Sequence, residues 1–472
     1  MKDNQKITVK RAVEICEGEL ISGNLEQELK SFCIDTRQLQ KGDIYVGIKG
    51  ETTDGNLFYE KALEAGAMGC LIQEIGIKPE IKEKYKDRSI IKVKNTIEAL
   101  QKLASYKRKQ YDIPVVAVTG SVGKTSTKDM IASVMGQKFH VLKTSGNYNN
   151  HIGLPLTLLR LEDHDAVVVE MGMNHFGEIR VLTNIAKPTV AVLTNIGTAH
   201  IGILGSRENI LKAKLEILEG MNSDGHIILN NDNDLLHKWG EEEKEHYSII
   251  TYGIENPSDY LASHIIRKND GSSFDVSINH KNNTIIVPIG GDHFILNSLA
   301  AISVGSLFEI APEKIKKGIE EFELTKRRME MLSLSNDILM INDSYNASFD
   351  SVKPAVAYLA HTEGKRKIAV LGDMLELGDY AKELHEKVGE EVAKNKIDIL
   401  IAVGDLSKYI MKKAEELGMP KEKMIHCKNA EEASEKLEKI LENGDRVLLK
   451  ASNAMKFNII VEKLSEILKK EI

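Results

Sequence analysis

The sequence predicts an α/β protein of three domains, on three observations. The chain has 472 residues, which at roughly 150 residues a domain corresponds to about three domains. Short apolar runs alternate with helical segments along most of the chain, which is typical of largely parallel sheets covered by helices. One apolar run also leads directly into a glycine-rich phosphate-binding sequence, which predicts a nucleotide-binding fold in the middle of the chain.

Residues 1–94 predict a small N-terminal α/β domain. Apolar runs at 44–48 and 69–72 are the expected strands, and residues 58–65 between them have the composition of a helix. A helical stretch over 96–111 then leads into the next domain.

Residues 95–322 predict a central domain with a mostly parallel sheet. Helical segments such as 208–220 separate its apolar runs, and residues 271–290 alternate polar and apolar side chains as a hairpin does. The expected strands are 115–119, 166–170, 190–195 and 227–230.

Residues 323–472 predict a C-terminal Rossmann-like α/β domain. The alternation begins again after Leu324-Thr-Lys-Arg-Arg328, and the helices, such as 430–442, are rich in Lys and Glu. The dinucleotide fingerprint GxGxxG is absent from the strand–helix junctions, so a nicotinamide-dependent oxidoreductase is poorly supported. The expected strands are 338–341, 368–371, 399–403 and 447–450.

The composition excludes several classes of protein. A net charge of -7 offers no general surface for nucleic acid or membrane. The four cysteines form no CxxC pair, which fits a reducing compartment and argues against a disulfide framework or a zinc site. No run of 18 apolar residues and no apolar core of a signal peptide occurs. We therefore expect a cytoplasmic protein that binds neither nucleic acid nor membrane.

The loop after the first central strand has the residues of a phosphate cradle. Its glycines let backbone N–H groups close around phosphate oxygens, and the helix that follows adds unpaired N–H groups. Lys124 can reach terminal phosphates and the Thr125 hydroxyl can hold Mg²⁺. The usual P-loop has a further glycine where this chain has Val118, so the loop is a shortened variant. The expected phosphate-binding residues are Gly120, Ser121, Val122, Gly123, Lys124, Thr125 and Ser126.

Candidate metal-binding residues follow the neighbouring strands. Glu170 ends its strand and is expected at the same sheet edge as the P-loop, where it either holds Mg²⁺ or caps a neighbouring loop. His200 lies just beyond the next strand, although a lone histidine is more often structural. Lys212 and Lys214 are two apart on an expected helix, so only one of them should point inward.

A polar turn, Asn147-Tyr-Asn-Asn150, follows the P-loop helix. Asn149 and Asn150 are either parts of a loop that leads into the next helix or amide donors for a phosphate or acyl group.

These motifs together resemble the Mur ligases, which are ATP-dependent amide-forming enzymes of peptidoglycan synthesis. The resemblance spans all three expected domains. It rests on Thr119-Gly-Ser-Val-Gly-Lys-Thr-Ser126, the segment from Asn147 to Pro155, Glu170-Met-Gly and Asn195-Ile-Gly-Thr-Ala-His200. The segments Asp35-Thr-Arg-Gln, Asn342-Asp-Ser-Tyr-Asn-Ala347 and Leu371-Gly-Asp-Met-Leu-Glu-Leu-Gly378 resemble one branch in particular, which joins D-alanyl-D-alanine to a UDP-N-acetylmuramoyl-tripeptide.

The resemblance implies an ATP- and Mg²⁺-dependent ligase with a ligand on each domain. The first domain would receive the UDP-sugar through Thr36 and Arg37, the second ATP, and the third the dipeptide. Glu170 and His200 match metal-associated positions. Lys214 matches a lysine that relatives carbamylate with CO₂, which turns a cation into an anionic Mg²⁺ ligand.

The resemblance also assigns residues around the nucleotide. Asn297 matches an adenine-contacting asparagine, and Arg327 or Arg328, with Asp343, matches positions near the nucleotide in the closed enzyme. Relatives have Asn where this chain has Phe294 and Asn-Pro where it has Ser348-Phe349. The family implies a monomer. The alternatives are the branch that adds the third amino acid, a folylpolyglutamate synthetase, and a P-loop ATPase that makes no product.

Overall fold

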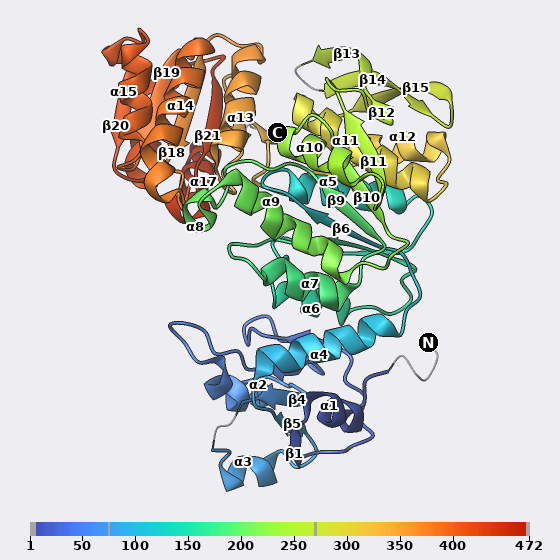
Figure 1. Cartoon of the computed structure of the whole chain (residues 1–472). Coiled ribbons are helices and arrows are strands. Elements are labelled where there is room, and N and C mark those ends of the chain that lie inside the picture. Colours follow the sequence, from blue (N-terminus) through green and yellow to red (C-terminus); the bar gives the residue numbers. More distant parts are fainter. Residues whose placement is uncertain (1–5, 74–75, 269–270, 469–472) are drawn as a thin grey trace.

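Four β-sheets organise the chain in a computed structural model that describes residues 6–73, 76–268 and 271–468 (Figure 1). Three of the sheets are wholly or mostly parallel and follow one another along the chain, which confirms the α/β class. The fourth is a small antiparallel sheet that follows the central one.

The first sheet has the order β1-β5-β4-β3-β2, with β1 antiparallel to β5 and the other pairs parallel. The strand expected at 44–48 ends at residue 46, where Gly47 turns to pack closely on Asn56. The elements are α1 (Val9–Cys16), β1 (Glu19–Ser22), β2 (Phe32–Cys33), β3 (Ile44–Val46), η2 (Gly55–Phe58), α2 (Tyr59–Glu64), β4 (Gly69–Ile72), α3 (Pro79–Lys84) and β5 (Ser89–Lys92).

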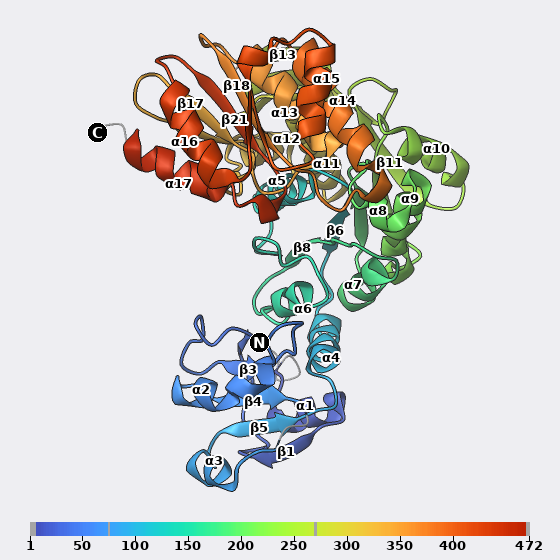
Figure 2. The same cartoon turned by 90° about the vertical axis from the view of Figure 1, so that its left-hand side faces the viewer.

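Helix α4 (Thr96–Lys109) lies between the first sheet and the central domain in both views (Figures 1 and 2). The Asn95 side chain caps its start by accepting the N–H groups of Ile97 and Glu98. Helix α4 packs on α1 on one side, and on α6 (Gly153–Leu158) and α7 (Glu178–Ala186) on the other. The helix therefore belongs to the packing of both domains.

The central sheet is parallel throughout, in the order β12-β11-β10-β9-β6-β8-β7. Every residue of β6, β8 and β9 is buried, because helices cover both faces of a parallel sheet. The strands are β6 (Val115–Thr119), β7 (Val141–Lys143), β8 (Ala166–Glu170), β9 (Val190–Leu193), β10 (His226–Asn230), β11 (Ser248–Gly253) and β12 (Tyr260–Leu261).

The helices of the central domain depart from expectation at one place. The expected helix at 208–220 is α-helical only to Leu215, and a 3-10 helix continues it because Glu216 turns to accept the N–H groups of Gly177 and Arg180. The remaining helices are α5 (Lys124–Met135), α8 (Ile201–Leu204), α9 (Arg207–Leu215), η3 (Glu216–Gly220), α10 (Asp234–Glu243), α11 (Asp292–Leu307) and α12 (Pro312–Glu320).

The hairpin expected at 271–290 is present. Strands β14 (Gly271–Ile278) and β15 (Lys281–Val287) pair antiparallel, and β13 (Ser263–Lys268) completes the small sheet.

The third sheet has the order β16-β17-β21-β18-β19-β20, and only the β16–β17 pair is antiparallel. The strand expected at 338–341 lies one residue later. The strands are β16 (Glu330–Ser333), β17 (Leu339–Asn342), β18 (Lys367–Gly372), β19 (Ile399–Val403), β20 (Met424–Cys427) and β21 (Arg446–Lys450). The helices are α13 (Phe349–His361), η4 (Gly378–Tyr380), α14 (Ala381–Lys394), α15 (Lys408–Glu416), η5 (Lys421–Lys423), α16 (Ala430–Ile440), η6 (Asn453–Met455) and α17 (Asn458–Ile467).

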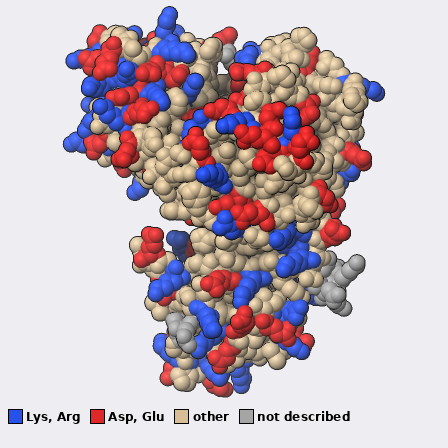
Figure 3. Space-filling view, in the orientation of Figure 1, with Lys and Arg blue, Asp and Glu red and all other residues tan. Residues whose placement is uncertain are grey.

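The surface gives no single-sign field on the face drawn in Figure 3, where basic and acidic side chains are interspersed. Across the three described stretches of the chain, no helix combines the length and the apolar character that crossing a bilayer requires.

The P-loop helix α5 is held by a close approach of α12. A Cβ added at Gly318 would lie 2.6 Å from the Val134 Cα, and the Ser133 hydroxyl donates to the Gly318 carbonyl at 2.6 Å. We expect Gly318→Ala to destabilise the protein by about 1–3 kcal/mol, because the neighbouring atoms are backbone and cannot move aside. Urea unfolding followed by circular dichroism measures this as a lower midpoint.

The control for Gly318→Ala is Lys314→Ala on the exposed face of the same helix, which should change the midpoint little. Helix propensity alone favours Ala over Gly by about 1 kcal/mol. A higher midpoint for Gly318→Ala would therefore mean that the close approach does not constrain α5.

Candidate active site

The P-loop joins β6 to α5 and takes its shape from the end of β9. The Asn195 carbonyl accepts the Ser121 N–H at 2.9 Å, its Oδ1 accepts the Val122 N–H at 3.0 Å, and its Nδ2 donates to the Val122 carbonyl at 3.0 Å. A Cβ at Gly120 would overlap the Thr194 Oγ1, so this position requires glycine. Sequence reasoning noticed Asn195 only as the end of a strand and missed this role.

The start of α5 has free backbone donors. Its N-cap is Gly123 at φ 80°, a left-handed conformation that favours glycine, and no side chain caps the helix. The first N–H groups of the helix therefore remain available to an anion.

The Lys124 ammonium folds back over the loop. Its Nζ donates to the carbonyls of Gly120 at 2.9 Å and Ser121 at 3.2 Å, which leaves one of three N–H groups for a ligand. Burial lowers the pKa of Lys124; Glu170 raises it, and the Arg328 cation lowers it further.

Glu170 ends β8 and is 2% exposed. Its Oε2 accepts the Thr125 hydroxyl at 2.7 Å and its Oε1 accepts the Asn149 Nδ2 at 2.7 Å. A hydroxyl and a carboxylate in contact beside a phosphate cradle are the hard oxygen donors that Mg²⁺ prefers. Within the described ranges no three His, Cys, Asp or Glu side chains group as a metal cage. The Thr125 hydroxyl and the Glu170 carboxylate fit Mg²⁺, an ion that also takes ligands from water and phosphate.

His200 lies at the left-handed φ of 64°, just before α8. Its Nδ1 is 2.7 Å from the Glu376 Oε2, which belongs to the third sheet's domain. Because a carboxylate only accepts, Nδ1 carries a proton in this contact, and in the neutral ring Nε2 then keeps its lone pair. Burial lowers the pKa of His200, as do the cations of Lys124 and Lys214, while Glu376 opposes them.

Lys214 is the inward member of the lysine pair on α9, as expected. It is 1% exposed, whereas Lys212 is exposed. Burial, helped by the Lys124 cation, lowers the pKa of Lys214 well below its ordinary value, and Glu170 opposes this. Burial thus favours the neutral form of the amine, which is the form that reacts with CO₂.

A cavity of about 460 Å³ unites these groups with the third domain. The central domain lines it with the P-loop residues, Glu170, His200 and Asn297. The third domain lines it with Arg328, Asp343, Tyr345 and Lys450. The carboxyl ends of β17 and β21 therefore face those of β6, β8 and β9 across the cavity.

Asn297 presents an unused donor to the cavity. It is 6% exposed, its Oδ1 accepts the Thr127 hydroxyl at 2.8 Å, and its Nδ2 is buried without a partner among the described residues. A buried donor without a partner costs about 1–3 kcal/mol. A ligand with a hydrogen-bond acceptor, such as the base of a nucleotide, would fit this position.

Arg328, and not Arg327, lines the cavity. Its guanidinium lies 4.1 Å from the Tyr345 ring centroid, and its Nε is buried without a partner in the described residues. Arg327 instead donates to the Ser344 carbonyl at 2.7 Å and to the Asn453 Oδ1 at 3.0 Å. Of the two arginines that the sequence left open, Arg328 is therefore the one that lines the cavity.

Asp343 is placed at the cavity as expected, and Lys450 joins it. Asp343 accepts the Met329 N–H at 3.1 Å and forms an ion pair with the Lys450 Nζ. The same ammonium donates to the Asn346 carbonyl at 3.2 Å.

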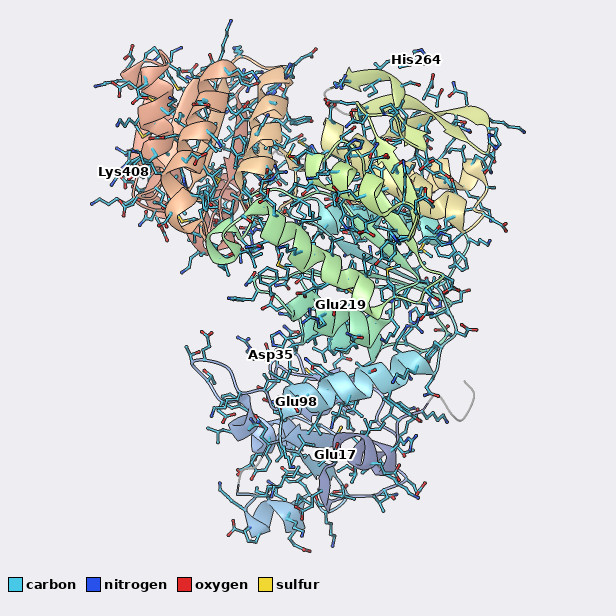
Figure 4. All side chains as sticks on the ribbon, in the orientation of Figure 1. Glu17, Asp35, Glu98, Glu219, His264 and Lys408 are labelled. Atoms are coloured by element: carbon cyan, nitrogen blue, oxygen red, sulfur yellow. The ribbon has the colours of Figure 1, made fainter. Side chains whose placement is uncertain are left out.

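Thr36 and Arg37 lie in the first domain, away from the residues that line the cavity. Arg37 is exposed and pairs with Asp35 at 2.7 Å, and this hydrogen-bonded pairing lowers the pKa of Asp35 to about 2. Figure 4 shows Asp35 at the edge of the first domain that faces the central domain.

The two asparagines of the polar turn have different roles. Asn149 holds Glu170, as described above. The Asn150 Oδ1 accepts the N–H groups of Ile152 at 3.1 Å and Gly153 at 2.8 Å, so it holds the turn into α6. Both residues also line the cavity.

Three family models match successive parts of the chain. They are described as "Mur ligase family, catalytic domain" at residues 28–108, "Mur ligase middle domain" at 118–305, and "Mur ligase, glutamate ligase domain" at 327–453.

Two relatives that the chain matches over most of its length carry the same name. The chain is 38% identical to the UDP-N-acetylmuramoyl-tripeptide–D-alanyl-D-alanine ligase of Bacillus subtilis, over 98% of this chain and 99% of that one. It is 34% identical to the ligase of the same name from Escherichia coli, over 86% and 87%. Among solved structures, MurF from Acinetobacter baumannii superposes with a TM-score of 0.86 at 28% identity, covering 98% and 99%. MurF from Thermotoga maritima in complex with ADP superposes with a TM-score of 0.80 at 27% sequence identity, covering 94% of this chain and 99% of that one.

The two adjacent arginines allow a matched test of the cavity. We expect Arg328→Met to weaken the binding of a non-hydrolysable ATP analogue about 10- to 100-fold, since a hydrogen bond to a charged group contributes about 1.5–3 kcal/mol. Arg327→Met should leave this affinity within about threefold and lower thermal stability instead, because it removes the bonds to Ser344 and Asn453. Calorimetric titration and thermal unfolding measure the two effects. The reverse pattern would return the nucleotide role to Arg327.

Proposed function

The chain belongs to the Mur ligase family, and we propose that it joins D-alanyl-D-alanine to a UDP-N-acetylmuramoyl-tripeptide with the cleavage of ATP to ADP and phosphate. The observation that carries the proposal is 38% identity to a ligase of that name over nearly the whole of both chains. The activity would serve peptidoglycan synthesis and hence cell-wall biogenesis. Free ATP and UDP-linked precursors are cytoplasmic substrates, so we assign the protein to the cytoplasm and, as in the family, to the monomeric state.

Each domain would hold one ligand. Residues 1–94 would bind the UDP-sugar, with Thr36 and Arg37 among the contacts. Residues 95–322 would bind ATP, and residues 323–472 would bring the dipeptide to the reacting centre.

The chemistry begins at the terminal carboxylate of the tripeptide. It attacks the γ-phosphate of ATP, and an acyl phosphate and ADP result. The amine of D-alanyl-D-alanine then attacks the acyl carbon, and the tetrahedral intermediate collapses to the amide and inorganic phosphate.

The residues of the chain mainly position and neutralise charge in these steps. The P-loop N–H groups and the free N–H of Lys124 would hold the phosphates, and Arg328 would approach from the third domain. Thr125 and Glu170 would hold one Mg²⁺, and His200 with a carbamylated Lys214 a second. Bound Mg²⁺ would screen the repulsion between the triphosphate and the attacking carboxylate.

Water must be kept from the acyl phosphate. Arg328, Tyr345 and Lys450 of the third domain cover one side of the cavity. This cover would favour attack by the dipeptide amine over hydrolysis.

A mass-spectrometric product assay tests the function. The substrates UDP-N-acetylmuramoyl-tripeptide, ATP and D-alanyl-D-alanine should give the pentapeptide product and ADP. Omission of the UDP-linked tripeptide or of D-alanyl-D-alanine should abolish the formation of both products. Extension of a UDP-linked dipeptide by a single amino acid would instead indicate the branch that adds the third residue. Equal ATP hydrolysis without either substrate would indicate an ATPase that makes no product.

Lys214 gives a second test of this assignment. We expect Lys214→Ala to lower turnover at least 100-fold and short-chain carboxylic acids to restore part of it, because they replace the lost carbamate. Lys212→Ala, two positions away and exposed, is the control and should keep near-normal turnover. The carbamate itself should appear as a ¹³C signal in wild-type protein supplied with labelled bicarbonate and be absent from the Lys214→Ala protein. Normal turnover of Lys214→Ala without added acid would exclude the role.

A further inference from the structure

The segment between β9 and α8, residues 194–200, connects three parts of the site. Asn195 shapes the P-loop at its beginning, and His200 stands at its end. The third domain touches the segment and α8 through Asp350, at the start of α13, and through the stretch 376–380.

Five hydrogen bonds hold the third domain on this segment and on residues 202 and 205 that follow it. The Asp350 Oδ2 accepts both the Thr198 N–H at 2.6 Å and the Thr198 hydroxyl at 2.7 Å. Glu376 accepts the His200 Nδ1–H at 2.7 Å with its side chain and the Gly202 N–H at 3.2 Å with its carbonyl. A further bond runs from the Tyr380 hydroxyl to the Gly205 carbonyl at 2.7 Å.

The contact is close enough to constrain both backbones. A Cβ at Gly202 would overlap the Gly378 N, and one at Gly378 would lie 3.1 Å from the Gly202 Cα. His200 at φ 64° and Glu376 at φ 63° both adopt the left-handed conformation. Such non-glycine conformations are unfavourable and persist where surrounding contacts enforce them. Here both strained residues meet in one hydrogen bond.

We propose that Glu376 is a positioning residue that holds the His200 ring for metal binding and thereby couples docking of the third domain to the metal site. Its carboxylate fixes the proton on Nδ1, so that Nε2 is presented as the ligand atom. Carboxylates that hold a metal-binding histidine in this way contribute about 10- to 100-fold in metal affinity. The proposal rests on the proposed function for the identity of the ion as Mg²⁺.

Coupling of this kind is reciprocal. If docking favours metal binding through Glu376, metal binding must favour the docked third domain by the same factor. Asp350 is a second anchor, which holds the same segment at Thr198 without contacting His200.

The test measures Mn²⁺ binding in the absence of substrates, by the electron paramagnetic resonance signal of the free ion. Glu376→Ala should weaken binding about 10- to 100-fold. Glu376→Gln should recover most of it, since the amide oxygen still accepts from Nδ1. Asp379→Ala removes an exposed carboxylate three residues away and is the matched control, with no expected change. Circular dichroism verifies that each variant is folded.

The second readout is the distance between dyes on the central and third domains, measured by energy transfer. Mn²⁺ should shorten the mean dye distance, or narrow its distribution, in the wild type and in Asp379→Ala. It should have little effect on either in Glu376→Ala. Wild-type Mn²⁺ affinity in folded Glu376→Ala would overturn the proposal, as would an unchanged response of the dye distance.

The outcome is separable from that of the product assay. Because Mn²⁺ binding is measured without any substrate, a protein that makes no pentapeptide product could still show the Glu376 effect. Conversely, if the protein makes the product but Glu376→Ala leaves its Mn²⁺ affinity unchanged, the proposed function stands and the role of Glu376 is excluded.

Discussion

The hydrogen bonds between Asn195 and the P-loop are the contact on which the rest of the site depends. They tie Ser121 and Val122 to the residues that follow β9, so that the phosphate cradle is bonded directly to the segment that carries His200. The close approach at Gly120 leaves no room for another arrangement. Parallel strands bring their carboxyl ends to one edge of the sheet. The Asn195 hydrogen bonds then set the position of the P-loop relative to the end of β9 at that edge.

Cations lie on both sides of the cavity. The Glu170 carboxylate acts on both Lys124 and Lys214, and Arg328 lines the cavity from the third domain. Burial lowers the pKa of both lysines, because desolvation disfavours the charged form of an amine. A site of this kind favours anionic ligands, which suits a triphosphate, a peptide carboxylate and the addition of CO₂ to a neutral amine.

Two of the contacts that hold the third domain lie at separate places. One is the β9–α8 segment described above. The other is the linker, where the Thr325 hydroxyl donates to the Asp129 Oδ2 at 2.6 Å while Lys128 and Lys143 contact the other oxygen of that carboxylate. Asp129 lies on α5, the helix that follows the P-loop. Both attachments therefore lead back to the P-loop, which explains how the position of a whole domain can affect atoms at the phosphates.

The sequence by itself determined the parts that act through local backbone geometry. The three α/β sheets, the P-loop between β6 and α5 and Glu170 at its strand end all follow from periodicity and spacing. The spacing of Lys212 and Lys214 required only that one of them point inward, and the family resemblance indicated Lys214. Only the tertiary structure decided which of Arg327 and Arg328 faces the cavity, that Asn195 shapes the P-loop, that α4 packs on two domains, and that Glu376 meets His200. The physical reason is that strand and helix periods fix a side chain relative to its own element, whereas these contacts join elements far apart in the chain. The geometry of these contacts depends on how the domains and their helices pack on one another, and the periodicity of a strand or helix carries no information about that packing.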